Sequence, residues 1–152
     1  PTKLGIVNFL CAAEADYELL ENQIIPSAIH KNMDLLPAGI IPPNPAELLS
    51  GSLLRDAIEY LSTKYDYVIL DTPPVALVSD TLIIGALANM TIFVTRADYS
   101  PKTNFELINS LSRDRKLPKC NIVINAVDIS KKRHSQQYGY YGHYGLYGSY
   151  GS

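Results

Sequence analysis

The last fifteen residues carry a series of phenolic hydroxyls, the side-chain type with the clearest chemical potential in the chain. Six of the eleven tyrosines stand there, and from Tyr141 onwards a glycine recurs at every third position. Neither an α-helix nor a β-strand has a period of three, and glycine makes an ordered backbone costly in entropy. The pattern therefore predicts a flexible tail that presents its aromatic side chains for recognition. These tyrosines are Tyr138, Tyr140, Tyr141, Tyr144, Tyr147 and Tyr150.

A carboxylate at the end of an apolar run is the second candidate for chemistry. Residues 67–71, Tyr-Val-Ile-Leu-Asp, are typical of a strand buried on both faces. Such a strand brings Asp71 to the carboxyl edge of an open α/β sheet, where these sheets bind ligands. A carboxylate there can hold Mg²⁺ through water beside the phosphates of a nucleotide. The alternative is an aspartate that only caps the turn after a strand.

The elements that must position these residues can be predicted from apolar spacing and from capping signals. Asn44, Pro45 and Glu47 are the residue types of a helix start with a capping box, whereas Pro37 indicates an edge strand. The predicted helices span residues 5–13, 44–64, 81–88 (which Asp80 can cap) and 100–115, and the predicted strands span residues 33–40, 67–71, 90–95 and 121–126.

The order of these elements predicts the fold class. Strands that alternate with helices imply a mostly parallel sheet flanked by helices, joined by right-handed crossovers. The fold class is therefore expected to be α/β, with three layers. We expect residues 1–130 to form the domain and residues 131–152 to form the flexible tail.

Composition and charge argue against several classes of protein. The chain has 152 residues, enough for one domain with a core, and its formal net charge of -2 argues against nucleic-acid binding. The longest apolar stretch, residues 81–94, is interrupted by Asn89 and is shorter than the ~20 residues of a membrane-spanning helix. Because the sequence starts at Pro1 and not at methionine, we expect it to be a piece of a longer protein.

Three sequence elements occur in one order: LLPAGIIPPNPAELL at 35–49, VILDTPPVALVSD at 68–80, and the terminal tyrosine cluster. Together they resemble the bacterial tyrosine kinases (BY-kinases), which regulate the synthesis and export of capsular and other extracellular polysaccharides. The resemblance implies a P-loop NTPase fold with ATP and Mg²⁺ as cofactors. It makes Asp71 the Walker B aspartate, which binds Mg²⁺ through water, and makes the tail tyrosines the sites of autophosphorylation.

The resemblance also suggests roles at two other strand ends. In related ATPases an asparagine at the position of Asn125 reads the adenine edge through its amide; stabilisation of the turn after the strand is the alternative, and both stay open. Arg96 ends the preceding strand and could face phosphate or a neighbouring subunit, or it could be solvated or in a salt bridge.

The resemblance implies partners as well. Family members form homo-oligomeric rings in which the tail of one subunit enters the site of the next. They act with a transmembrane activator or a fused membrane domain at the inner, cytoplasmic face of the plasma membrane. A tyrosine phosphatase is a further implied partner, and nucleic acid is not.

Two family motifs are missing from the sequence. The family's Walker A loop, glycine-rich with Gly-Lys-Ser/Thr, does not occur, and neither does the Asp-rich strand that follows it. We therefore expect the full-length protein to be a protein-tyrosine kinase that has lost roughly its N-terminal third in this sequence, and this chain alone to be inactive. Two other interpretations stay open: a partitioning-type ATPase with an unrelated tail, and a non-catalytic α/β domain whose tail is a substrate or an interaction module.

Overall fold

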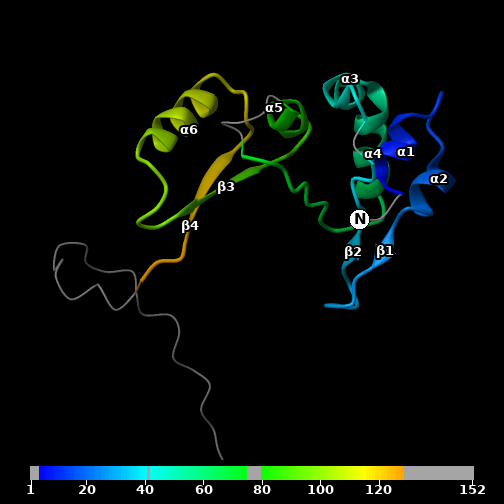
Figure 1. The fold of residues 1–152 in the computed structure, drawn as a ribbon, viewed down its shortest axis with the longest axis horizontal. Coiled ribbons are helices and arrows are strands. Elements are labelled where there is room, and N and C mark those ends of the chain that lie inside the picture. Colours follow the sequence, from blue (N-terminus) through cyan, green and yellow to red (C-terminus); the bar gives the residue numbers. More distant parts are fainter. Residues whose placement is uncertain (1–3, 41, 75–79, 129–152) are drawn as a thin grey trace, which may run out of the picture.

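The computed structural model describes residues 4–40, 42–74 and 80–128, which form two groups of elements (Figure 1). All six tail tyrosines lie outside the described residues. The first group holds α1 (Ile6–Leu10), α2 (Tyr17–Glu21), β1 (Ile25–Pro26), β2 (Asp34–Leu35), α3 (Pro45–Ser50) and α4 (Ser52–Ser62). The second group holds α5 (Asp80–Gly85), β3 (Thr91–Arg96), α6 (Thr103–Arg113) and β4 (Cys120–Asn125). Helices α3 and α5 contact each other and join the two groups.

The core of the first group lies between α1, α2 and α4. Phe9 of α1 and Leu20 of α2 are fully buried there. Helix α4 packs against them with Leu54, Ala57 and Leu61, which share one face because they are three and four residues apart. Burial of this face, more than helix propensity, stabilises a helix of this length in water.

The start of α1 is held by the segment that follows β2. The amides of Ile6 and Val7 donate to the carbonyl oxygens of Pro37 (2.9 Å) and Ala38 (3.1 Å), so two N–H groups with no partner inside the helix are satisfied. This pairing brings two glycines into backbone contact. A Cβ on Gly5 would lie 2.4 Å from the amide nitrogen of Gly39 and from the carbonyl oxygen of Pro37.

We expect Gly5→Ala to lower the free energy of unfolding by about 2–4 kcal/mol, because backbone atoms must move to admit the methyl group. Urea denaturation of the chain measures this change. Gly51→Ala is the control: its Cβ would meet a carbonyl oxygen of Leu48 at 3.3 Å, and we expect less than about 1 kcal/mol. Equal losses in the two variants would contradict the close approach at Gly5.

The second group is built on a parallel strand pair. Strands β3 and β4 pair in parallel from Thr91 opposite Cys120 to Arg96 opposite Asn125. Helix α6 connects them and buries Ile108 and Leu111. These elements confirm the predicted strands at 90–95 and 121–126, the helix at 100–115, and the α/β fold class. The shorter helices α1 and α5 confirm those predicted at 5–13 and 81–88.

The prediction of one continuous helix over residues 44–64 is wrong, because the structure has two helices there. Gly51 has an extended backbone (φ −70°, ψ 165°) and separates α3 from α4. Glycine has little helix propensity, and serine on both sides of it can begin or end a helix. The predicted cap is also different: the Asn44 side chain donates to the Glu47 carboxylate and makes no capping bond to the backbone.

Two predicted strands differ from the structure. The strand predicted over residues 33–40 is only Asp34–Leu35, exposed, and paired antiparallel with β1. The strand predicted over residues 67–71 does not form, and Ile69 is 88% exposed. A strand needs a neighbour for its backbone groups, and within the described ranges no strand lies beside this segment. The parallel sheet of the described residues is therefore narrower than the sequence predicts.

Within the described ranges of the chain, no helix has both the length and the apolar character that crossing a bilayer requires.

Candidate functional site

The carboxyl edge of the β3–β4 pair brings two predicted site residues together. Arg96 and Asn125 are register partners at the last position of the pair, and the Ala97 amide donates to the Asn125 carbonyl oxygen at 2.9 Å. Both side chains are exposed. Parallel strands end at the same edge of a sheet, and open α/β sheets bind ligands outside that edge. The pair is thus placed where the fold class binds its ligands.

The Asn125 side chain has one of its two polar atoms engaged. Its Oδ1 accepts the Ala126 amide at 2.8 Å, and Ala126 has a left-handed backbone with φ +54°. That bond stabilises a turn that is strained for a residue with a Cβ. The carboxamide oxygen therefore stabilises the turn after the strand. This is one of the two roles that the sequence leaves open for Asn125; the other is to read the adenine edge. The Nδ2 group remains the atom that could donate to a base.

Arg96 is held at the end of β3 by the turn that follows. Its amide donates to the Ser100 hydroxyl and its carbonyl accepts the Ser100 amide, both at 2.9 Å. The guanidinium carbon lies 5.6 Å from the centre of the Tyr99 ring, within the range of a cation–π contact. Such a contact keeps the positive charge of Arg96 near the edge of the sheet.

Asp71 does not lie at the end of a strand. It is exposed, in the segment 66–74 that connects α4 to α5. Two residues later, the Pro73 carbonyl accepts the hydroxyl of Thr81 at 3.0 Å, and the buried Thr81 ties the segment to α5. In the part of the chain that the structure describes, no hydrogen bond or ion pair joins Asp71 to Arg96 or Asn125.

The metal site that the sequence predicts rests on one carboxylate, that of Asp71. The described ranges contain no cluster of three or more His, Cys, Asp or Glu side chains that could hold a metal ion. Mg²⁺ needs no such cage, because it keeps several waters and uses one or two carboxylates together with the phosphates of its nucleotide. The exposed carboxylate of Asp71 fits that donor set, with the metal held through water.

A cluster of aromatic and charged side chains fixes the end of α4, and sequence analysis missed it. The rings of Tyr17 and Tyr60 stack with centroids 4.3 Å apart, and the Tyr60 hydroxyl donates to the Glu21 carboxylate at 2.5 Å. Lys64 forms an ion pair with Glu21, and its ammonium lies 4.8 Å from the centre of the Tyr60 ring. The hydrogen bond from Lys64, followed by that from Tyr60, lowers the pKa of the Glu21 carboxyl.

Tyr65, which follows Lys64 just after the end of α4, is hydrogen-bonded to β2. The Tyr65 hydroxyl donates to the Asp34 carboxylate at 2.7 Å, and this hydrogen bond raises the pKa of Tyr65. Both ties lie just before the segment that carries Asp71, so they fix where that segment begins. Glu21 and Tyr60 are 39 residues apart, a separation at which no local sequence pattern could indicate the pair.

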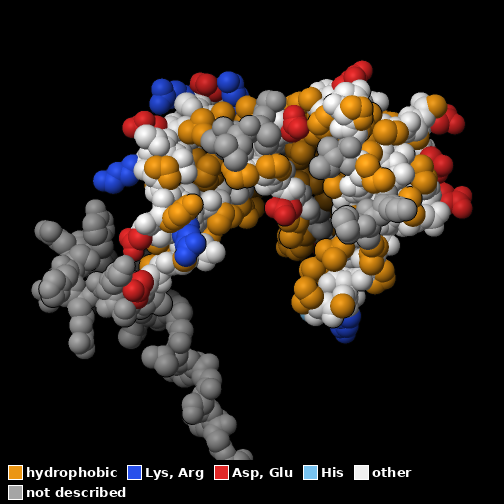
Figure 2. Space-filling model, viewed as in Figure 1, with side chains coloured by type: hydrophobic (Ala, Val, Ile, Leu, Met, Phe, Trp, Pro, Cys, Tyr) orange, Lys and Arg blue, Asp and Glu red, His pale blue; other side chains and the backbone are white. Residues whose placement is uncertain are grey.

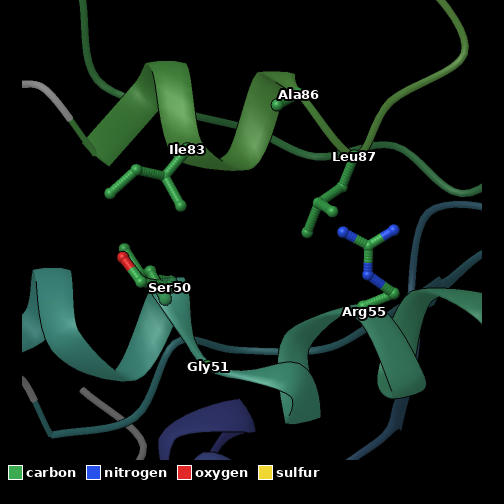
Figure 3. A pocket seen from close by; sticks show the side chains of 7 residues that line it. Ser50, Gly51, Arg55, Ile83, Ala86 and Leu87 are labelled. Carbon is green, nitrogen blue, oxygen red and sulfur yellow. The ribbon is translucent and has the colours of Figure 1, made fainter.

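A pocket of about 250 Å³ lies between α5 and the junction of α3 with α4 (Figure 3). Its walls are mainly apolar, and Arg55 supplies the only charged side chain among its lining residues. Figure 3 shows the Arg55 guanidinium beside Leu87, across the pocket from Ile83 and Ser50. None of the predicted site residues lines it, so this pocket is separate from the edge that holds Arg96 and Asn125.

Comparisons with known proteins point to one group. The tyrosine-protein kinase Wzc of Salmonella typhimurium is 38% identical over 117 residues, which are 76% of this chain and 16% of Wzc. The tyrosine-protein kinase YwqD of Bacillus subtilis is 34% identical over 118 residues, 78% of this chain and 48% of YwqD. No protein-family model matches the chain.

Solved structures agree with these relatives. The crystal structure of the VpsO kinase domain matches with a TM-score of 0.69 and 25% identity, covering 84% of this chain and 60% of that domain. The chain therefore spans about half of YwqD and a little over half of the VpsO kinase domain, but only 16% of Wzc.

Proposed function

Because this chain belongs to the family of bacterial tyrosine kinases, we propose that it forms part of the catalytic domain of an ATP-dependent protein-tyrosine autokinase. The observation that carries the proposal is the agreement of sequence and fold: named tyrosine-protein kinases match three quarters of the chain, and a kinase domain superposes on 84% of it. In this proposal the protein regulates the synthesis and export of capsular polysaccharide or exopolysaccharide.

Each predicted site residue has a proposed task in phosphoryl transfer, which depends mostly on positioning and charge neutralisation. Bound ATP with Mg²⁺ supplies the phosphoryl group and part of the neutralising charge. Asp71 holds the metal through water. Asn125 donates from Nδ2 to the adenine edge while its oxygen maintains the turn, and Arg96 offers a positive charge to phosphate or to a neighbouring subunit.

The tail tyrosines are the proposed acceptors. A phenol near its ordinary pKa of ~10 is neutral, so it needs a base or a polarising site to lose its proton as its oxygen takes the phosphoryl group. A tail with glycine at every third position can bring several hydroxyls to one site in turn. The site belongs to a neighbouring copy if the subunits form a ring.

The proposed kinase also has partners and a cellular location. The kinase acts as a homo-oligomeric ring at the cytoplasmic face of the plasma membrane, held there by a transmembrane activator or a fused membrane domain. A tyrosine phosphatase removes the phosphate groups. In the sequence of this chain, the feature that supports these partners is the tyrosine tail, which each subunit of a ring would present to its neighbour.

Mass spectrometry of the full-length protein incubated with Mg-ATP tests the proposal. We expect phosphate on several of the six tail tyrosines, and none when EDTA removes the metal. A tail that stays unmodified in a protein that binds ATP would refute the autokinase assignment.

A second candidate is a tail that is only a substrate, and the Tyr/Gly pattern of the last fifteen residues favours it because such a tail can present its hydroxyls to another enzyme. No Gly-Lys-Ser/Thr loop that could bind phosphate occurs in the 152 residues given. Incubating this chain alone with Mg-ATP should therefore give no phosphotyrosine. If the full-length protein is equally inactive, but a separate tyrosine kinase phosphorylates the tail, the substrate function replaces the autokinase.

A further inference from the structure

The pocket between α5 and the junction of α3 with α4 combines apolar walls with one positive charge. Leu49 of α3 lines it together with Ile83, Ala86 and Leu87, which lie in and just after α5. Figure 3 shows the Arg55 guanidinium beside Leu87. Helices α3 and α5 already contact each other, and in Figure 2 hydrophobic side chains surround the region where the two groups of elements meet. Apolar walls with few polar groups are typical of a ligand site.

The charge of Arg55 is not neutralised by any described residue. Within the described ranges no ion pair joins Arg55 to a carboxylate, not even to Glu59 one turn further along α4. The Ser50 hydroxyl, also in the lining, already donates to the Ala46 carbonyl oxygen at 2.7 Å. Arg55 therefore supplies the donors for a ligand, and a guanidinium binds carboxylate or phosphate through two parallel N–H groups.

This combination selects a ligand with an apolar ring and an anionic end. Phosphotyrosine has both, because its ring buries apolar surface and its phosphate carries about -1.5 to -2 charges at neutral pH. Phosphoserine would leave the apolar walls without a contact, and an unmodified tyrosine would leave Arg55 without an anion. Six tyrosines stand in the last fifteen residues, so the chain itself contains the side chain that such a ligand needs.

The tail is long enough to bring one of its tyrosines to the pocket. The described residues end at Asp128, shortly after the end of β4. Residues 129–152 span up to about 80 Å when fully extended, whereas a domain of this size has a radius of gyration of only ~15 Å. The pocket of the same subunit and the pocket of a neighbouring subunit are both within that reach.

We propose that this pocket binds a phosphotyrosine of the tail, with the aromatic ring against Ile83 and Leu87 and the phosphate on the guanidinium of Arg55. The choice of occupant rests on the proposed function, because autophosphorylation supplies the modified tyrosine. Recognition of a phosphorylated segment by arginine is a recurring mode of peptide binding. Here one arginine provides the charge, and the apolar walls provide the selectivity for an aromatic ring.

A separate site of this kind has a consequence for the tail. In the proposed function, the site that transfers the phosphoryl group holds nucleotide phosphates and a carboxylate, so it repels a tail that already carries phosphate. None of Asp71, Arg96 and Asn125 lines the pocket. The pocket therefore holds the phosphorylated tail away from the transfer site, which a tyrosine that is still unmodified can enter.

Fluorescence polarisation with a labelled peptide of residues 138–152 that carries phosphate on Tyr144 tests the proposal. The full-length protein is first dephosphorylated by a tyrosine phosphatase, separated from it and kept without ATP, so that its own tail cannot compete. We expect this peptide to bind at least ~10-fold more tightly than the unphosphorylated peptide, and than a peptide with phosphoserine in place of Tyr144. Equal affinity for either of these two peptides would overturn the proposal.

Arg55→Gln is the decisive variant, and we expect it to weaken binding of the phosphotyrosine peptide by at least ~10-fold. Arg113→Gln is the matched control: Arg113 is exposed in the last turn of α6 and does not line the pocket, so the affinity should stay within about 2-fold. Ala86→Phe keeps the charge but fills the pocket with a ring, and it should also weaken binding by at least ~10-fold. Equal affinity of the two arginine variants would refute the proposal, and so would full affinity in Ala86→Phe.

The readouts separate this inference from the proposed function, because the peptide is supplied already phosphorylated. Binding that depends on Arg55, with a tail that stays unmodified in Mg-ATP, supports the pocket and refutes the autokinase; another kinase then supplies the phosphotyrosine. Tail phosphorylation in a protein whose peptide binding does not depend on Arg55 supports the autokinase and refutes the pocket.

Discussion

Asp71→Asn in the full-length protein is expected to slow tail phosphorylation by about 10²- to 10³-fold, the range found when one electrostatic group is removed from a transition state. The amide keeps the size of the side chain and can still bind water, but it loses the negative charge that holds Mg²⁺. Because Asp71 is exposed and buries no core surface, the variant should fold normally. Rates of phosphotyrosine formation at saturating ATP, measured over a series of Mg²⁺ concentrations, check this expectation.

Asp66→Asn is the matched control for that experiment. Asp66 is an exposed aspartate at the start of the same connecting segment, beside the Tyr65 side chain that is tied to Asp34. Its replacement removes the same charge at a different place, and we expect the rate to stay within about 3-fold of the wild type. If both variants are equally slow, the loss is a property of the net charge and not of Asp71. If Asp71→Asn keeps the full rate, its role at the metal is refuted.

The elements that the sequence predicts well are those whose signals are local. Short apolar runs predict β3 and β4, and helical spacing of apolar residues predicts α6. The observed bounds of all three elements lie within a few residues of the predicted ones. Arg96 and Asn125 could both be placed at strand ends for the same reason, and the parallel pairing then puts them at one edge. What the sequence does not contain is the register that makes them partners.

The features that the sequence could not provide depend on distant neighbours. The pair of Glu21 with Tyr60, and that of Asp34 with Tyr65, joins residues more than thirty positions apart. Gly51 interrupts a helix that a capping signal and an apolar face both favoured. Residues 67–71 have the composition of a buried strand, but composition cannot supply the neighbour that a strand needs. The same dependence explains why Asp71 stands apart from its predicted site.

Replacing all six tail tyrosines by phenylalanine should keep the proposed ring assembled in the presence of ATP, whereas the wild type should dissociate as phosphate accumulates. Each phosphotyrosine adds about -1.5 to -2 charges, so six would add about -9 to -12. Residues 131–152 now contain three Lys or Arg side chains and no Asp or Glu. Full phosphorylation therefore reverses the sign of the tail, and a site that already holds phosphates and a carboxylate should repel it.

Light scattering of the full-length protein, sampled as phosphotyrosine accumulates, measures this dissociation. Phenylalanine keeps the aromatic ring and removes only the acceptor oxygen, so contacts made by the rings stay intact in the variant. Salt provides the control for mechanism: repulsion between exposed charges is screened within about 8 Å at 0.15 M ionic strength and within about 3 Å at 1 M. High salt should therefore restore part of the assembly of the phosphorylated wild type. If the phenylalanine variant dissociates with ATP as the wild type does, charge on the tail is not what controls assembly.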